Sequence, residues 1–461
     1  MKIKQTKGIT LIALVITIIV LLILAGVTIN MLTGDNGILK QATNARETNT
    51  KAELEEQVKL AVMASKVNNT ASINLETLET ELNKISGATI TKSTEDKLPW
   101  TVKKESYEVT ITADGTITTN TTGKDDETKI DYGTKTPAED TRTVIEQAKA
   151  AMPERATIDT NTNETTGIVM IDSNQNEWVW VEVPSTVFTT ATSSTDYNNI
   201  KADLIAYASD YRGSYTDEWY NGCGLTQEEY NTNYNKMLSS IYTNKGFYIG
   251  RYEAGIEGSD TNTSLARYSR TEITSSSPKA VSKKDMIPYN YVYCSDAQQL
   301  ASKMSTGNKT SSLMYGIQWD LVCKFLEVKG NWDTSTNTAQ YYIKSNSISW
   351  GNYNNSTFTI NSTNAKKYNS SNKSCDDITG EKTSSMLLTT GASEYTNKMN
   401  IYDFAGNEYE WTLENTTNTN SPCCNRGGSY FYSGSSIPAS NRNFVSTTYS
   451  NYNHGLRPSL Y

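Results

Sequence analysis

The residues of this chain that could perform chemistry fit no common catalytic site in type and spacing. The chain has 461 residues but one histidine, His454, which excludes most histidine-based catalysis and most histidine-built metal centres. No Cys-x-x-Cys pair and no phosphate-binding glycine loop are present, so neither a zinc ribbon nor a nucleotide cradle is expected. Glu408 and Glu410 could serve a glycosidase as paired carboxylates, although we expect a structural role for this pair.

The cysteines leave two alternatives open. An even number of them in an exported region permits disulfides, with fifteen pairings for six residues, and buried free thiols are the alternative. The six are Cys223, Cys294, Cys323, Cys375, Cys423 and Cys424.

The composition favours a binding surface. Tyr outnumbers Phe by 29 to 7, and tyrosine combines apolar area with a hydroxyl group. The net charge of −8 argues against nucleic acid as a partner. From residue 430 to residue 454 the chain is rich in Tyr, Ser and Asn, as antibody binding loops are, although a polar bias of the whole chain is the alternative explanation. The predicted ligand-binding residues are Tyr430, Tyr432, Ser433, Asn441, Asn443, Tyr449, Asn451, Tyr452, Asn453 and His454.

Three short segments flank this tail and must position it. Residues 406–412 read Gly-Asn-Glu-Tyr-Glu-Trp-Thr, residues 425–430 read Asn-Arg-Gly-Gly-Ser-Tyr, and residues 455–458 read Gly-Leu-Arg-Pro. Their order resembles the formylglycine-generating-enzyme (sulfatase-modifying factor) family, over about residues 167–461. The resemblance implies a C-type-lectin-like domain in which the tail is an exposed ligand face. In members diversified by retroelements this same segment varies.

The resemblance also implies roles for single residues. The family's copper-binding catalytic cysteines fall at Tyr432 and Ile437, neither of which supplies a thiolate, so we predict that the chain is not an enzyme. The family's structural calcium site points to Asn407 and Glu410, which carry oxygen ligands of the right kind; we expect no other cofactor. Trp411, Arg426 and Arg457 are expected to be buried scaffold residues, as large aromatic and motif residues usually are.

The amino terminus predicts a membrane-inserted helix. Three lysines within the first seven residues precede an uncharged run from Ile9 to Ile29, which as a helix would be about 31 Å long and match the hydrocarbon thickness of a membrane. The run is too long for a signal-peptide core. The basic flank keeps the amino end in the cytoplasm and exports the rest of the chain.

Residues 7–12, Lys-Gly-Ile-Thr-Leu-Ile, resemble the type IV prepilin signature. This resemblance implies cleavage by a prepilin peptidase between Gly8 and Ile9, with the apolar helix kept for filament assembly. Ala13 stands where major pilins carry a glutamate, and its lack of a counter-charge points to a minor or tip subunit.

The predicted fold class is α+β. A long N-terminal pilin helix leads to a small β headgroup, for which alternating residues around Asp114-Gly115 predict a hairpin, and a C-type-lectin-like domain with short irregular sheets follows. An Asn- and Ser-rich stretch at residues 352–374 predicts a surface insertion. The expected regions are a leader at 1–8, a membrane and assembly helix at 9–66, a headgroup at 67–120, a linker at 121–166 and a binding domain at 167–461.

Together these features predict a minor or tip type IV pilin that acts as an adhesin on the cell surface or extracellular pilus. Before assembly it would sit in the inner or cytoplasmic membrane. Its expected partners are other pilin subunits, bound through the N-terminal helix, the prepilin peptidase, and an unknown surface protein or glycan. An exported enzyme of the formylglycine-generating type and a structural pilin without a specific ligand are the alternatives.

Overall fold

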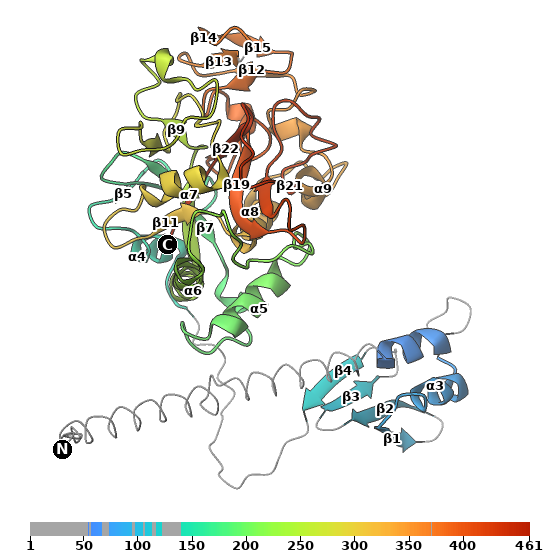
Figure 1. Cartoon of the computed structure of the whole chain (residues 1–461). Coiled ribbons are helices and arrows are strands. Elements are labelled where there is room, and N and C mark those ends of the chain that lie inside the picture. The colour runs from blue at the N-terminus through green and yellow to red at the C-terminus, as the bar shows by residue number, and fades with distance from the viewer. Residues whose placement is uncertain are drawn as a thin grey trace, which may run out of the picture. The chain divides into compact units, whose positions relative to one another are not determined.

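The computed structural model describes residues 54, 57–66, 73–94, 97–104, 107–112, 117–121, 140–369 and 371–461. Contacts divide the chain into two units, residues 1–132 and 133–461, both drawn in Figure 1. The predicted leader, the apolar run and the cleavage pair Gly8–Ile9 lie outside the described residues. None of the helices that the structure describes is long and apolar enough to cross a membrane.

The N-terminal unit joins two helical segments to one antiparallel sheet of order β1-β2-β3-β4. The helical segments are residues 57–65 and α3 (Leu75–Leu82). Alternate residues of β2, Trp100 and Val102, share a core with Leu78 and Leu82, because strand and helix periodicities each place apolar side chains on one face. The predicted hairpin is confirmed as β3 paired with β4. The strands are β1 (Ala88–Thr94), β2 (Lys97–Lys104), β3 (Tyr107–Ile111) and β4 (Ile117–Thr121).

The C-terminal unit is built around an antiparallel sheet of order β11-β23-β8-β7-β6-β5. Its central strands β7 and β8 are buried at successive positions; since successive side chains point to opposite faces, both faces of the sheet are covered there. The strands are β5 (Thr157–Ile158), β6 (Val169–Ile171), β7 (Glu177–Glu182), β8 (Gly246–Gly250), β11 (Ser311–Leu313) and β23 (Pro458–Leu460).

A second sheet carries the sequence motifs and the tail. Its order is β21-β20-β19-β22, in which β22 pairs with β19 in parallel and the other pairs are antiparallel. In Figure 1 it lies beside α8 (Gly316–Lys329), which is buried on all sides over residues 316–323. The strands are β19 (Tyr409–Asn415), β20 (Cys423–Arg426), β21 (Arg442–Val445) and β22 (His454–Leu456).

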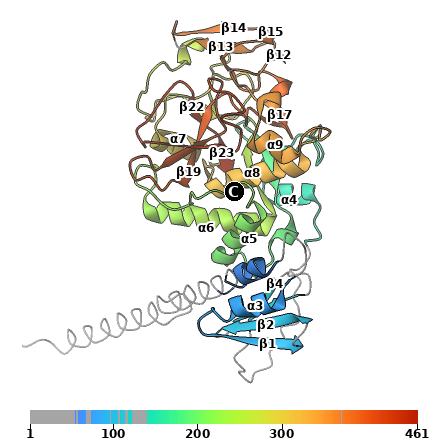
Figure 2. The same cartoon turned by 90° about the vertical axis from the view of Figure 1, so that its right-hand side faces the viewer.

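Helices and short hairpins surround these sheets. Both views place the β12–β15 hairpins at the opposite end of this unit from α5 and α6 (Figures 1 and 2). The helices are α4 (Val144–Ala150), α5 (Tyr197–Tyr207), α6 (Gln227–Asn244), α7 (Cys294–Ser302) and α9 (Ala339–Lys344). The remaining strands are β9 (Gly255–Ile256), β10 (Ala280–Val281), β12 (Phe358–Ile360), β13 (Lys366–Asn369), β14 (Ser374–Asp377), β15 (Gly380–Lys382), β16 (Leu387–Leu388), β17 (Asn397–Lys398) and β18 (Ile401–Tyr402).

The mixed α+β class with short sheets is confirmed, but the linker boundary needs correction. Residues 140–166, assigned above to the linker, contain α4 and β5. Helix α4 begins with a capping box between Thr143 and Glu146, and Tyr248 of β8 donates its hydroxyl to the Ala148 carbonyl at 2.8 Å. Tertiary packing therefore holds a segment whose polar composition masked its few apolar residues.

Candidate ligand-binding face

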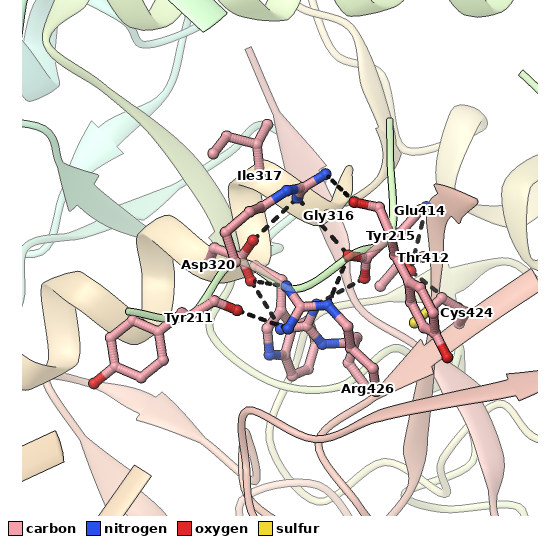
Figure 3. Close-up of polar contacts among 12 residues, drawn as sticks. Tyr211, Tyr215, Gly316, Ile317, Asp320, Thr412, Glu414, Cys424 and Arg426 are labelled. Atoms are coloured by element: carbon pink, nitrogen blue, oxygen red, sulfur yellow. Dashed lines mark hydrogen bonds and ion pairs between the residues drawn. The ribbon is translucent and has the colours of Figure 1, made fainter. Parts of the chain in front are cut away.

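A buried ion network joins the strands that carry the tail to α8. Figure 3 shows the Arg426 guanidinium between two acids: Nη1 donates to Glu414 at 2.7 Å and Nη2 to Asp320 at 2.9 Å. Arg212 pairs with Asp320 at 3.0 Å and with Asp217 at 3.1 Å. Because every acid in this group is buried, removal of one arginine would leave a carboxylate unpaired in an apolar interior.

The third arginine of the network, Arg442, comes from the tail itself. Its Nε donates to Glu414 at 2.8 Å, its Nη2 to Asp320 at 2.6 Å and its Nη1 to the Tyr211 carbonyl at 2.6 Å. Burial raises the pKa of Glu414, but Arg426, Arg442 and Arg212 outweigh it and bring that pKa to about 2. Glu414 therefore stays ionised at neutral pH and holds the tail at Arg442.

A second buried pair fixes the end of the chain. Arg457 donates Nη2 to Glu410 at 2.7 Å and Nη1 to the Gly250 carbonyl at 2.9 Å. Trp411 is fully buried and donates its indole N–H to the Val292 carbonyl at 3.1 Å. The prediction that Trp411, Arg426 and Arg457 are buried scaffold residues is confirmed.

The predicted calcium ligands already have protein partners. Both Glu410 oxygens accept from Arg457 Nε, at 3.0 and 3.1 Å. The Asn407 oxygen accepts from Asn352 at 2.8 Å and from the Leu388 N–H at 3.2 Å. Among the described residues, no group of three or more His, Cys, Asp and Glu side chains is placed to hold a metal ion. These two side chains therefore do not fit the calcium site that the resemblance implies.

Glu408 and Glu253 are further buried carboxylates beside Asn407. Glu253 accepts from the Glu408 N–H at 3.0 Å and from Asn407 Nδ2 at 2.6 Å. Burial raises the pKa of both carboxyl groups. Since Glu408 and Glu410 are both about 1% exposed, a substrate cannot reach them as a glycosidase pair. Glu253 was not predicted; a lone glutamate after the apolar strand 246–250 was the available signal.

The tail exposes a group of aromatic rings that we call the aromatic face: Phe431, Tyr432, Tyr449 and Tyr452. Phe431, Tyr432 and Tyr449 are 49%, 42% and 39% exposed, and Tyr452 is half-buried. Phe431 lies 5.4 Å from Tyr432 and 6.3 Å from Tyr452 between ring centroids. The Tyr449 ring is linked to Tyr432 indirectly, through the rings of His454 and Tyr409. Large exposed aromatic side chains at adjoining positions are typical of interaction surfaces.

Beneath the aromatic face lie three predicted ligand residues that the structure buries. Tyr430, Asn453 and His454 are 8%, 4% and 3% exposed, so they support the face rather than contact a ligand. The His454 ring lies 4.9 Å from the Tyr449 ring and 5.1 Å from the Tyr409 ring. His454 is buried because β22 begins at this residue and pairs with β19. The scaffold therefore begins before the Gly455 motif.

The remaining predicted residues are half-buried and spread over the tail. Ser433 accepts from Asn355 at 2.9 Å, and Asn451 donates to the Tyr449 hydroxyl at 3.0 Å, so both adjoin the aromatic face. Asn441 and Asn443 instead flank Arg442 at the start of β21. Phe431 and Phe444 were missed by the prediction; Phe444 of β21 is 50% exposed, and phenylalanine in a polar tail was the signal.

Residues 352–356, from the predicted surface insertion, in fact brace the aromatic face. Asn354 donates its backbone N–H to the Tyr432 carbonyl and its Nδ2 to the Phe431 carbonyl, both at 3.0 Å. Behind this loop, Lys382 donates to the Tyr353 carbonyl, and to the Ser356 carbonyl at 2.8 Å. Burial lowers the pKa of Lys382 to about 8. The backbone at Phe431 and Tyr432 is therefore held by the loop at residues 352–356, in addition to the anchor of the tail at Arg442.

The positions of the family's catalytic cysteines hold an exposed Tyr432 and a half-buried Ile437. The six cysteines lie elsewhere as free thiols, five of them buried and Cys375 half-buried. Burial raises the pKa of Cys323 and Cys424, and brings that of Cys223 to about 11, which disfavours the reactive thiolate.

One comparison with known proteins shows the family of this chain. The sequence profile of the sulfatase-modifying factor enzyme 1-like domain family matches residues 216–458, more than half of the chain. The chain therefore belongs to this family, whose domain is C-type-lectin-like. Treponema denticola variable protein 1 is similar at 14% identity and a TM-score of 0.25, over 47% of this chain and 84% of that one. No curated protein matches the sequence.

Proposed function

We propose that this chain is a surface-displayed binding protein, a minor or tip type IV pilin whose C-terminal domain binds a surface protein or glycan through the aromatic face. The observation that carries the proposal is that Phe431, Tyr432 and Tyr449 are exposed together on a backbone held by buried ion pairs. Rigid aromatic side chains lose little conformational entropy on binding.

Two features of the face support recognition. Among residues 430–456 the one charged side chain is Arg442, which is already paired with Glu414 and Asp320. The exposed surface is consequently aromatic and amide-rich, and a ligand does not have to desolvate charges to reach it. The ion pairs fix the backbone, so the exposed side chains can vary without loss of the fold, as retroelement diversification would require.

Display on a pilus rests on the amino terminus. The prepilin-like segment at residues 7–12 and the apolar run at 9–29 support cleavage after Gly8, membrane residence before assembly and attachment to other pilin subunits through the retained helix. Ala13 supports a tip position over the shaft. Mass spectrometry of the mature terminus and immunogold labelling test these two points: an intact Met1, or even decoration of the whole shaft, would reject them.

The enzymatic alternative lacks support because the copper-binding cysteines of the family are absent from their expected positions. Tyr432 and Ile437 cannot bind copper as thiolates, and the other thiols are mostly buried. The full chain should therefore not convert cysteine to formylglycine in a sulfatase-type peptide, with or without copper. Appearance of that product would return the enzyme hypothesis.

The binding proposal is tested with the full chain in detergent, screened against panels of glycans and surface proteins. Once a ligand is found, Tyr449→Ala and Tyr432→Ala should each weaken binding by about tenfold or more, because contact energy concentrates in a few exposed aromatic residues. Tyr341→Ala is the matched control, since Tyr341 is a 36% exposed tyrosine on α9, outside the aromatic face.

Equal loss of binding in the control, or none in either face variant, would contradict the proposal. A panel without any ligand would favour the structural pilin.

A further inference from the structure

A cavity separate from the aromatic face has the features of a built binding site. It has a volume of about 510 Å³, within the range of small-molecule pockets. Its lining comes from Asp159, Asn161 and three threonines of the same segment, from the β17–β18 turn at 397–400, from Gly330 and Asn331 beyond α8, and from Arg251. None of the predicted ligand residues of the tail belongs to its lining.

The walls of the cavity are fixed by one unusual turn. Met399 and Asn400 connect β17 to β18 with φ angles of 54° and 61°, a left-handed pair that a two-residue hairpin turn requires and that methionine rarely adopts. Asn400 donates to the Thr166 and Gly167 carbonyls at 3.0 and 2.8 Å and accepts from Arg251 at 2.7 Å. Costly backbone conformations of this kind concentrate at functional sites. Here the hydrogen bonds of Asn400 join the β17–β18 turn to residues 166–167 and to Arg251.

Lys398 contributes to the cavity lining an ammonium group that takes part in no ion pair among the described residues. Its ammonium group lies 4.5 Å from the centre of a Trp332 ring and has no hydrogen-bond or ion-pair partner among the residues that the structure describes. Burial lowers its pKa. The lining holds two cations, Arg251 and Lys398, and one acid, Asp159, whose Oδ1 accepts two hydrogen bonds from Asn161 at 3.0 Å.

Two further polar atoms of the lining residues are unused. Arg251 pairs its Nη1 with Glu177 at 2.6 Å, but its buried Nε has no hydrogen-bond partner, and neither has the buried Oδ1 of Asn397. Buried polar groups without partners are rare in native proteins. Both atoms are enclosed by protein, so a ligand in the cavity does not reach them. The unpaired ammonium group of Lys398 is the group of the lining that suits an anionic ligand.

The rest of the lining favours a sugar over a simple anion. The cavity is larger than a carboxylate or phosphate ion requires, and its lining includes several residues with amide or hydroxyl side chains, which both donate and accept as sugar hydroxyls do. They include Asn161, Thr162, Thr165, Thr166 and Asn331. We propose that this cavity binds an acidic sugar residue, with the carboxylate at Lys398 and the hydroxyls among the Asn and Thr side chains.

The test measures binding of glucuronate and galacturonate to the full chain by calorimetry, beside glucose, galactose and acetate. Both uronates should bind more tightly than the neutral sugars and acetate, and Lys398→Met should weaken the uronates by about tenfold or more. Lys201→Met is the matched control, because Lys201 also lies over an aromatic ring, that of Tyr234 at 5.7 Å, but lines another groove. It should leave uronate affinity unchanged.

A second measurement does not depend on the folding of a variant. Glucuronate should slow the modification of Lys398 by an amine-reactive reagent, read by mass spectrometry, and leave the modification of Lys201 unchanged. Neutral sugars binding as well as uronates, acetate binding as well as either, no binding of either uronate, or protection at Lys201 instead of Lys398 would each overturn the proposal.

Discussion

Arg442 lies in the middle of the binding tail, yet its Nε donates to the buried carboxylate of Glu414 at 2.8 Å. A residue between two candidate ligand contacts, Asn441 and Asn443, is thus part of the scaffold. The aromatic face draws residues from both sides of this anchor, Phe431 and Tyr432 before it and Tyr449 and Tyr452 after it.

The first prediction concerns this anchor. Arg442→Met leaves Glu414 and Asp320 with one guanidinium fewer in a buried site, and should lower the free energy of unfolding by about 3 kcal/mol. Denaturant titration checks it. Arg270→Met is the control, since Arg270 pairs with Asp296 at 3.0 Å near the surface and should cost about 1 kcal/mol or less. Equal losses in the two variants would show that the network does not hold the tail.

The second prediction separates two tyrosines that are two positions apart in the sequence. Tyr430 is buried and Tyr432 is exposed. Tyr430→Ala should cost about 3 kcal/mol of stability, as removal of a buried aromatic side chain does, whereas Tyr432→Ala should cost about 1 kcal/mol or less. Thermal unfolding of both variants distinguishes them, and a reversed order would mean that the two side chains face the other way.

The order of the three motifs predicted the scaffold, because Trp411, Arg426 and Arg457 lie in motif segments and large aromatic residues of such segments are usually buried. Their partners were not predictable. Arg426 meets Asp320 across 106 residues of sequence, and nothing local marks an aspartate in the middle of a helix as its partner. Long-range contacts of this kind depend on topology, which composition does not specify.

The sequence also did not predict which side chains of the tail are exposed to solvent. The sequence identified residues 430–454 as a surface, but the outward side chains depend on where strand pairing starts. Pairing of β22 with β19 begins at His454, so Asn453 and His454 turn inward, while Phe431 points out. Composition identifies a binding segment, and register decides which of its side chains are available.

The third prediction concerns calcium. Because Glu410 and Asn407 already have protein partners, the melting temperature should not change when EDTA or excess calcium is added. Glu410→Gln should lower it equally under both conditions, since the variant loses its pair with Arg457 and not a metal ligand. A calcium-dependent rise in the wild type that Glu410→Gln abolishes would restore the calcium site.

The fourth prediction uses the single histidine. The rings of Tyr409, Trp411 and Tyr449 surround His454, its Nδ1 lies 2.9 Å from the Asn453 side-chain oxygen and its Nε2 has no partner. Burial lowers the pKa of His454 to about 3. The folded chain therefore keeps the imidazole neutral at pH 5, while the unfolded chain protonates it near its ordinary pKa of about 6.5.

The unfolded state then binds more protons than the folded state below pH 6.5, so His454 lowers stability as the pH falls from 6.5 toward 3. Between pH 7 and pH 5 the loss amounts to about 2 kcal/mol, at about 1.4 kcal/mol for each pH unit. Other groups titrate in this range, so the quantity to compare is the change between pH 7 and pH 5 in the wild type and in His454→Gln, which lacks the titrating ring. The variant should lose about 2 kcal/mol less. In NMR spectra the ring signals of His454 should stay constant down to pH 5. Titration of these signals near pH 6.5 would contradict the prediction, because it would mean that solvent reaches the His454 ring.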